Sequence, residues 1–407
     1  MLLIREWNEF WFTERSPAPI GLFRIGLGAM FFFWFLLIAP PTLYTWYSER
    51  GPFPLSFYHY YKGSTIELSL FGGLSDPHIL FAIWALCLVL SILFMIGYFT
   101  KPSAFLLFLL YVSFNNRDPL VLNSGDTMLR CCLFIMLLAP CGASCSVDRI
   151  IAISRGKDRG GDLAPREMWT QRILQIQIAL IYTATVCSKL NGRDWMNGTA
   201  VYYPLHMVDL ARYPIPGWIS NDTVINIMTW GTLVIEASMA TLIWNRRLRP
   251  YALGAGVLLH SSIEYALNIP LFSMIMITSY LNFVYNDWIA LWVTMLTRSF
   301  VRYRIEVRLP DGVTPADRWW LVLERLDFLH LMQVNASSRE PVESLNVTGR
   351  GWQADGPAAL QRILFRIPTF WLLAPVILLP GSLKILANLL PQPSLPTSQN
   401  HIIPSSS

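Results

Sequence analysis

Charged residues are scarce in this chain. They make up 14% of its 407 residues, whereas hydrophobic residues make up 54%. Soluble domains carry roughly a quarter charged residues, so this composition excludes an ordinary soluble protein and indicates a membrane protein. The net charge of +5 is modest and lies mainly between the apolar runs. It therefore reports membrane topology and does not suggest a nucleic-acid partner.

Cysteine is also sparse, and familiar catalytic motifs are missing. Six cysteines do not make a disulfide framework in a chain of this length. Four lie in apolar runs, where free cysteine behaves as a small hydrophobic residue: Cys87, Cys131, Cys132 and Cys187. Cys141 and Cys145 have no metal-ligating neighbours in the sequence, so we predict no metal site. No phosphate loop, zinc constellation or serine triad is found in the sequence.

Long apolar runs are what the chain has in abundance. A membrane span needs roughly 20 mostly apolar residues, and on this basis we predict about eight spans, some of them short. They cover residues 20–40, 78–98, 103–115, 128–142, 170–189, 223–244, 250–267 and 269–296. The third and fourth spans flank a polar hairpin, which we expect to lie inside the bundle because non-helical backbone at membrane depth must be buried or face water. The predicted fold class is an α-helical integral membrane bundle.

The arginine-rich segments predict the orientation of this bundle. Three of them, within 142–170, 246–249 and 298–308, should be cytoplasmic by the positive-inside rule. Alternation of the spans then places three segments outside the cell: 41–77, 115–127 and 190–222. Both termini are predicted to be cytoplasmic in a multi-pass protein of the plasma (inner) membrane. Residues 1–19 form no cleavable signal peptide and are predicted to lie as an amphipathic segment along the membrane surface.

The character of the chain changes after the membrane domain, which we place at residues 20–297. The pattern predicts strand, helix, strand and helix at 304–312, 317–332, 345–351 and 358–367. Residues 303–390 are therefore predicted to form a small cytoplasmic α/β domain. The tail at 391–407 is rich in proline and serine and is predicted to be disordered.

Ionisable residues within or beside the predicted spans are candidates for a functional site, because burying charge in a membrane is costly. They are Asp126, Arg130, Lys189, Arg193, Asp194, Glu236, His260 and Glu264. Structural roles compete with functional ones. Asp126 and Arg130 have the spacing of an ion pair within one helix. Glu236 could instead pair with an arginine of a neighbouring span. His260 could instead be a histidine that is hydrogen-bonded within the bundle.

Lys189, in the stretch SKLNGRDW, has two interpretations. It is either a lysine that snorkels to water from the outer end of its span or a base held where water is scarce. The stretch itself brings Asp194 and Trp195, and the outward hairpin with Asn116 and Arg117 should lie at the same depth. Desolvation in such a cleft favours the neutral amine, which can act as a general base. With His260, these four neighbours are the predicted substrate-binding residues.

Four stretches together point to a known family: residues 115–130, 178–203, 228–250 and 258–280. SKLNGRDW at 188–195 and LNIPLFS at 267–273 are their most specific parts. Over about residues 10–297 the chain resembles the HTTM family, a membrane module related to vitamin K-dependent γ-glutamyl carboxylase.

This resemblance implies a chemistry. The carboxylase uses a membrane lysine to deprotonate reduced vitamin K, and oxygen then yields an epoxide and a strong base that allows a glutamate to be carboxylated. Lys189 occupies the matching place, so the resemblance implies Lys189 as the base, a reduced vitamin K or menaquinol as cofactor, and an external peptide or protein as a further partner. Arg117 stands where the carboxylase has a histidine, and because arginine does not deprotonate, its role would be electrostatic. The lumenal region that binds the carboxylase's substrate has no counterpart in this sequence.

The C-terminal domain resembles the DCC family of thioredoxin-like thiol-disulfide oxidoreductases. Asp311 and Gly312 fit the start of that pattern, but Thr314 and Asp317 stand at the two cysteine positions. Without thiolates there is no exchange chemistry, so the resemblance implies a redox-inactive thioredoxin-like scaffold.

Two hypotheses for the whole chain follow. One is a membrane enzyme that acts on a quinol with Lys189 as base, and it is favoured by the Lys189 motif, which this chain retains by resemblance to the carboxylase. The other is a non-catalytic membrane protein that binds lipid or a protein partner, which Arg117 and the replaced cysteines favour.

Overall fold

The computed structural model of the chain describes residues 2–40, 54–62, 76–117, 122–155, 166–310, 317–327, 329–334 and 344–368, together with short stretches and single positions between 43 and 74 and at 384. It divides into two compact units. The first, here called the membrane unit, comprises residues 1–149 and 160–286. The second, the C-terminal unit, comprises residues 150–159 and 287–407. The predicted disordered tail lies outside the described residues.

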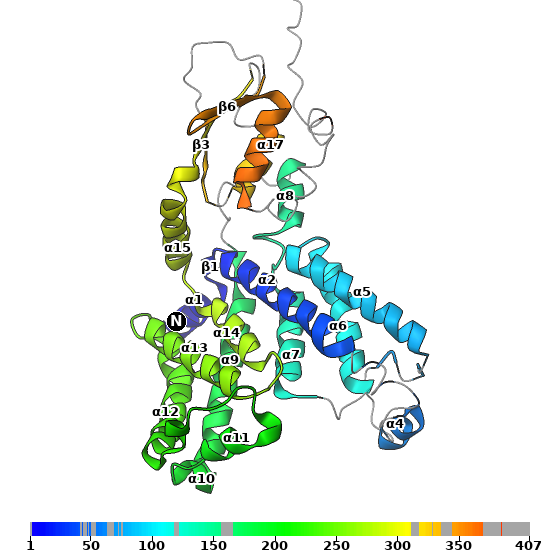
Figure 1. Cartoon of the computed structure of the whole chain (residues 1–407), viewed down its shortest axis with the longest axis vertical. Coiled ribbons are helices and arrows are strands. Elements are labelled where there is room, and N and C mark those ends of the chain that lie inside the picture. The colour runs from blue at the N-terminus through cyan, green and yellow to red at the C-terminus, as the bar shows by residue number, and fades with distance from the viewer. Residues whose placement is uncertain are drawn as a thin grey trace, which may run out of the picture. The chain divides into compact units, whose positions relative to one another are not determined.

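The membrane unit is built from helices (Figure 1). Its longer described helices are α1 (Leu2–Phe12), α2 (Ala18–Phe33), α5 (Pro77–Ile96), α6 (Thr100–Arg117), α7 (Ser124–Leu138), α9 (Trp169–Leu190), α12 (Asp222–Thr241) and α13 (Arg249–Ala266). Shorter ones are the π-helical η1 (Trp34–Ile38), α4 (Leu55–Lys62), α10 (Arg193–Met196), α11 (Tyr202–His206), η3 (Val208–Leu210), η4 (Gly217–Ser220), η5 (Leu242–Trp244), α14 (Phe272–Ser279) and η6 (Tyr280–Phe283). α8 (Val147–Ser154) crosses the boundary between the units.

Four helices in the described part of the chain are long and apolar enough to cross a membrane. They are Ala18–Ile38, Pro77–Ile96, Trp169–Leu190 and Asp222–Trp244. The protein is therefore a helical membrane protein, and these helices coincide with four of the predicted spans. The predicted spans at 103–115, 128–142 and 250–267 correspond to α6, α7 and α13, which are helical but do not meet the same criterion of length and apolarity.

The predicted span at 269–296 is not one helix. α14 and η6 end at Phe283, and a separate helix, α15 (Asn286–Ser299), follows and belongs almost wholly to the C-terminal unit. The backbone carbonyls at this break bind side chains from other helices. The carbonyl of Asn282 accepts hydrogen bonds from Gln171 and Gln175, both at 2.7 Å, and that of Phe283 accepts one from Arg249 at 3.2 Å. These partners satisfy backbone groups that a continuous helix would satisfy internally.

The core of the membrane unit is rich in aromatic side chains. The Tyr111 ring meets Phe31 and Trp34 edge-on, with ring centroids 4.9 and 5.2 Å apart. The Tyr111 hydroxyl and the Trp34 indole N–H both donate to Asp126, at 2.8 and 2.9 Å. Asp126 also completes a capping box at the start of α7, where it accepts the Asn123 backbone N–H. A buried carboxylate with three donors is satisfied locally, so Asp126 has a structural role, and its hydrogen-bond partners replace the predicted pairing with Arg130.

One end of the membrane unit gathers segments that the sequence assigns to the cytoplasm. The short strand β1 (Glu14–Arg15) pairs antiparallel with β2 (Arg166–Glu167), which places the start of α2 beside the start of α9. At the same end, Arg249 at the start of α13 binds the carbonyls of Ile243 and Phe283. These segments lie at one end of the membrane unit, as the predicted alternation of the spans requires. Which side of the membrane this end faces stays a prediction.

The C-terminal unit contains a small sheet. Its described elements are η7 (Val301–Tyr303), β3 (Ile305–Arg308), α16 (Arg318–Leu326), β4 (Met332–Val334), β5 (Asn346–Gly349), β6 (Trp352–Asp355) and α17 (Gly356–Arg366). The strand order is β4-β3-β5-β6, in which β3 and β4 are parallel and the other pairs antiparallel. Buried Val307, Val347, Trp320 and Ile363 join the sheet to the helices.

The sequence predicted four of these elements but missed two strands. β4 has three residues, the first of which, Met332, falls at the end of the helix predicted at 317–332, whereas the observed helix ends at Leu326. The chain leaves the helical path there: the backbone N–H of Met332 donates to Asp327 at 2.7 Å, and His330 has a positive φ of 51°. β6 follows β5 through a tight turn at Gly351, whose φ of 75° suits glycine.

Candidate functional site: a buried ion pair between α9 and α12

Lys189 forms an ion pair with Glu236. Its ammonium lies in the last turn of α9 and donates directly to Oε1 of Glu236, which is well inside α12. The two side chains retain 21% and 10% of their exposure, so neither is bathed in solvent. Side chains on a helix lean toward its N-terminus, and Lys189 therefore reaches back along α9 instead of outward. The lysine replaces the arginine that was considered as the partner of Glu236.

The SKLNGRDW stretch folds so that Trp195 covers the same amine. α9 ends at Leu190, and Gly192 is the N-cap of the short helix α10. The Lys189 ammonium lies 4.7 Å from the centroid of the Trp195 ring, within the range of a cation–π interaction. A Cβ on Gly192 would come within 3.0 Å of the Trp195 ring and 3.2 Å of the Lys189 carbonyl. Glycine thus permits the close turn that brings tryptophan over the lysine.

Asp194 contributes to this turn through its backbone. Its carbonyl accepts the N–H groups of Thr199 and Ala200, at 2.9 and 3.1 Å. The residue is exposed on α10, and the partners of Lys189 in the described part of the chain are Glu236 and Trp195. Asp194 therefore shapes the turn around Lys189 and makes no direct contact with its amine.

His260 lies in a second buried group beside the ion pair. Its Nε2 is 2.8 Å from the hydroxyl of Tyr182, which is also hydrogen-bonded to the hydroxyl of Tyr280. Tyr182 and Lys189 are seven residues apart on α9, so they share one face of that helix. Glu236 lies close enough for its charge to interact electrostatically with Tyr182 and Tyr280, and Lys189 close enough for its charge to interact with His260. The ion pair and the Tyr182–Tyr280–His260 group together form what we call the α9–α12–α13 polar cluster.

Two buried polar atoms of this cluster have no hydrogen-bond partner among the described residues. They are Oε2 of Glu236 and Nδ1 of His260. Buried polar groups in native proteins are nearly always hydrogen-bonded. Oε2 of Glu236 can accept a hydrogen bond from a bound hydroxyl or from water, and Nδ1 of His260 accepts or donates one according to which ring nitrogen carries the proton. Sequence reasoning missed the tyrosines, although the seven-residue spacing from Tyr182 to Lys189 carried a signal.

Asn116 and Arg117 lie elsewhere in the membrane unit. They end α6, where Arg117 is fully buried and its guanidinium carbon lies 5.2 Å from the centroid of the Tyr58 ring of α4. Figure 1 shows α4 well away from α10 and α11. Of the predicted site residues, the structure thus gathers Lys189, Trp195 and His260, but it does not bring Asn116 and Arg117 to them.

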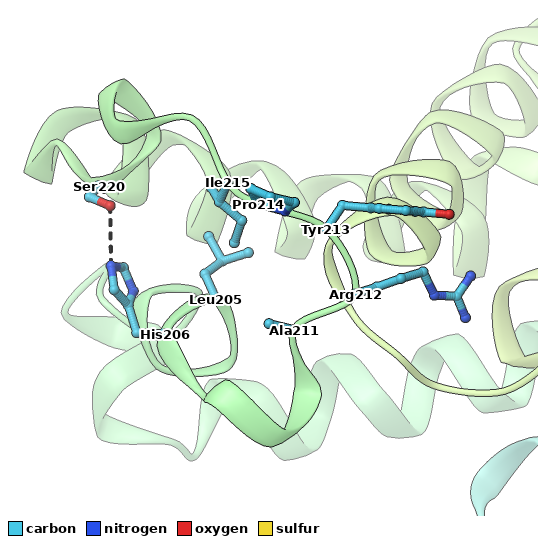
Figure 2. A pocket seen from close by; sticks show the side chains of 8 residues that line it. All are labelled: Leu205, His206, Ala211, Arg212, Tyr213, Pro214, Ile215 and Ser220. Atoms are coloured by element: carbon cyan, nitrogen blue, oxygen red, sulfur yellow. Dashed lines mark hydrogen bonds between the residues drawn. The ribbon is translucent and has the colours of Figure 1, made fainter.

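A cavity of about 450 Å³ opens beyond the cluster, in the segment between α11 and α12 (Figure 2). It is lined by Leu205, His206, Ala211, Arg212, Tyr213, Pro214, Ile215 and Ser220. Its volume is in the usual range for small-molecule sites. Arg212 pairs with Glu264, one turn along α13 from His260. The cavity therefore adjoins the cluster through α13 but is lined by none of its residues.

The sequence relationships of the chain agree with this architecture. A family model described as the HTTM domain matches residues 12–288. Sporulation-delaying protein SdpB of Bacillus subtilis (strain 168) is 25% identical over 118 residues, which is 28% of this chain and 36% of SdpB. The chain thus matches about a third of the length of that relative. No solved structure matches it. The family model covers well over half of the sequence, and the chain belongs to the HTTM family.

Proposed function

We propose that this protein is a membrane enzyme in which Lys189 takes a proton from the hydroxyl of a quinol held within the helical bundle, on the extracytoplasmic side of the membrane. Membership of the HTTM family supports a relationship to the vitamin K-dependent carboxylase module. The observation that carries the proposal is the direct Lys189–Glu236 pair beside two buried polar atoms that have no hydrogen-bond partner among the described residues. Ionisable groups in a membrane bundle are costly and are commonly functional.

The ion pair gives Lys189 a route to its neutral form. In the proposed step, Lys189 passes a proton from Nζ to Oε1 of Glu236 and then accepts the proton of the quinol hydroxyl. The pair begins as ammonium and carboxylate and ends as ammonium and carboxylic acid, so it gains the one proton that the hydroxyl loses. A carboxylate in contact with the amine thus replaces simple desolvation as the means of making lysine a base.

The unpartnered atoms fit a ligand with hydroxyl groups. Oε2 of Glu236 would accept a hydrogen bond from such a group, and Nδ1 of His260 would accept one from its hydrogen or donate one to its oxygen, because a hydroxyl can serve in either role. The Trp195 ring, which covers the amine, would exclude water from the same place. By resemblance to the carboxylase, a reduced vitamin K or menaquinol would supply the hydroxyl and, with oxygen, the chemistry of epoxide formation.

The test is epoxide formation by the purified protein with reduced menaquinone and oxygen. We expect turnover in the natural protein, loss of at least about a hundredfold in Lys189→Ala because general base catalysis contributes ~10²–10⁴-fold, and normal turnover in Lys101→Ala. Lys101 is a suitable control because it lies outside the α9–α12–α13 polar cluster, at the start of α6, where it binds the carbonyls of Leu137 and Ala139 at the end of α7. Absence of turnover in the natural protein, or equal turnover in both variants, would exclude the catalytic role and leave a membrane scaffold that binds lipid or a partner.

We also infer that the C-terminal unit is a thioredoxin-like scaffold without redox activity. Its sheet order, with parallel β3 and β4 joined by α16 and an antiparallel β5–β6 hairpin followed by α17, supports this proposal. Asp317 is the N-cap of α16, the first described helix after β3, and all six cysteines precede residue 287. Residue 314 lies outside the described residues.

Restoring two cysteines tests this proposal. The double variant Thr314→Cys/Asp317→Cys is expected to form a 314–317 disulfide after mild oxidation, detectable by peptide mass spectrometry, and to gain thiol-disulfide exchange activity. The single variant Thr314→Cys is the control. Two free thiols in the oxidised double variant would argue against a thioredoxin-like active-site turn.

A further inference from the structure

Three arginines converge at the end of the membrane unit opposite Lys189. Arg15 belongs to β1, Arg172 to the first turn of α9 and Arg249 to the start of α13. Arg15 and Arg249 line a cavity of about 50 Å³. Its other lining residues are Ser16, Pro19, Gln171, Gln175, Phe283, Val284, Tyr285 and Asn286. A single water needs roughly 10–15 Å³, so this cavity has room for several waters or a small anionic group.

The three guanidiniums repel one another. Arg15 and Arg249 both lie close enough to Arg172 for their charges to repel its charge, and Arg15 repels Arg249 in the same way. Burial lowers the pKa of Arg15 from its ordinary value, which shows that its charged form is poorly solvated there. Arg249 keeps only 6% of its exposure.

No carboxylate neutralises these charges among the described residues. Arg172 donates to the Phe10 carbonyl at 3.0 Å and to the Gln175 side chain at 2.9 Å, and Arg249 donates to the carbonyls of Ile243 and Phe283. All of these acceptors are neutral. The Arg15 side chain has neither a hydrogen bond nor an ion pair within the described part of the chain. Clustered, partly buried cations without an anion are unfavourable.

We propose that this arginine cluster (Arg15, Arg172 and Arg249) binds a phosphate group, supplied by the headgroup of an anionic lipid or by free phosphate. Guanidiniums present forked N–H donors that match phosphate oxygens. The Ser16 hydroxyl accepts the N–H of Ala18 at 3.2 Å, so its own hydrogen can serve as a further donor.

The neighbouring helix favours a lipid as the source. α1 carries Leu3, Ile4 and Trp7 with 80%, 66% and 61% of their surface exposed, as expected for a helix lying in the interface of a membrane. The same helix is tied to the cluster, because its Phe10 carbonyl binds Arg172. Basic pockets between membrane helices at the cytoplasmic side are suited to anionic headgroups.

The experiment measures thermal unfolding of the full chain, purified in a phosphate-free detergent. The additions are a short-chain phosphatidylglycerol, inorganic phosphate and, as a neutral control, a short-chain diacylglycerol. The variant Arg15→Gln removes one cation whose side chain makes no hydrogen bond to the described residues, so its fold should persist. Arg247→Gln is the matched control, since Arg247 is exposed in the turn before α13.

We expect phosphatidylglycerol to raise the unfolding temperature of the natural protein and of Arg247→Gln, with about tenfold weaker apparent affinity in Arg15→Gln. A shift with phosphatidylglycerol alone identifies a lipid, a shift with inorganic phosphate alone identifies free phosphate, and shifts with both that weaken in Arg15→Gln identify a site open to either. No shift with either compound, a shift with diacylglycerol equal to that with phosphatidylglycerol, or equal shifts in both variants would overturn the proposal.

Discussion

The ammonium of Lys189 and the carboxylate of Glu236, 47 positions apart in the sequence, form a direct ion pair between α9 and α12. Burying either charge alone in the bundle would cost free energy, and the opposite charge of its partner offsets this cost. The pair therefore joins two helices and, in the proposed enzyme, also sets the protonation of the base. These two roles can be separated experimentally, because stability responds to the pairing and activity to the identity of the amine.

The first prediction concerns the coupling of this pair. Lys189→Met or Glu236→Leu alone should lower the free energy of unfolding by about 2 kcal/mol or more, below the ~3–5 kcal/mol of a fully buried pair because Lys189 stays partly exposed. The double variant should recover much of this loss, since no unpaired charge remains. Unfolding followed by circular dichroism in detergent would measure the cycle.

The surface pair Arg5–Glu9 provides the control for this cycle. Its two side chains keep 73% and 64% of their exposure at a separation of 3.3 Å. Its coupling should stay below about 0.5 kcal/mol, as for other exposed helical pairs. Additive effects at Lys189 and Glu236 would contradict the pairing.

The second prediction concerns Arg24, a fully buried arginine in α2. Its guanidinium donates to the carbonyls of Cys141, at 2.7 Å, Ser144, at 3.1 Å, Met95, at 3.4 Å, and Cys145. Arg24→Met should lower the free energy of unfolding by more than about 3 kcal/mol, because each buried carbonyl left without a donor costs ~1–3 kcal/mol. Thermal unfolding would show this as a large fall in midpoint.

An exposed arginine serves as the comparison for Arg24. Arg247→Met removes the same charge from a solvent-facing turn and should change stability by no more than about 0.5 kcal/mol. Similar unfolding midpoints for the two variants would mean that the Arg24 carbonyl contacts contribute nothing to the fold.

The sequence predicted the four long apolar helices of the described chain because roughly 20 consecutive apolar residues have few alternatives to a membrane helix. It failed where backbone groups find partners across the bundle. The run at 269–296 is apolar enough to suggest one helix, but Gln171 and Gln175 bind the Asn282 carbonyl, and the helix ends there. Such partners come from distant parts of the chain and leave no local pattern.

The candidate site was predicted in part for the same reason. Lys189 and Trp195 are close in sequence, so the short turn at Gly192 could be expected to bring them together. Glu236 and Tyr280 join them only through packing of α12 and η6 against α9, whereas Tyr182 shares one face of α9 with Lys189. Asn116 and Arg117 were placed near Lys189 by membrane depth alone, and depth does not say on which side of a bundle a residue lies.

The third prediction compares the same substitution at two helical glycines. Gly28 of α2 lies so close to α5 that an added Cβ would come within 2.7 Å of the Met95 Cα, whereas nothing lies within 4 Å of a Cβ at Gly231 of α12. Gly28→Ala should destabilise by about 1–3 kcal/mol through overpacking. Gly231→Ala should be neutral or stabilise by up to ~1 kcal/mol through helix propensity. Unfolding midpoints that move in the same direction by similar amounts would contradict the close approach of α2 and α5.

The fourth prediction tests the orientation of the bundle. If the arginine-rich turn before α13 is cytoplasmic, the segment between α9 and α12 lies outside the cell. In a background with Cys145 and Cys187 replaced by serine, an impermeant maleimide should therefore label Val208→Cys in intact spheroplasts and should label Arg247→Cys only after lysis. Val208 is 88% exposed and Arg247 is exposed too, so access to either thiol is limited by the membrane and not by burial. Labelling in the opposite order would invert the topology and would put the Lys189 end of the bundle in the cytoplasm, where the proposed extracytoplasmic chemistry could not take place.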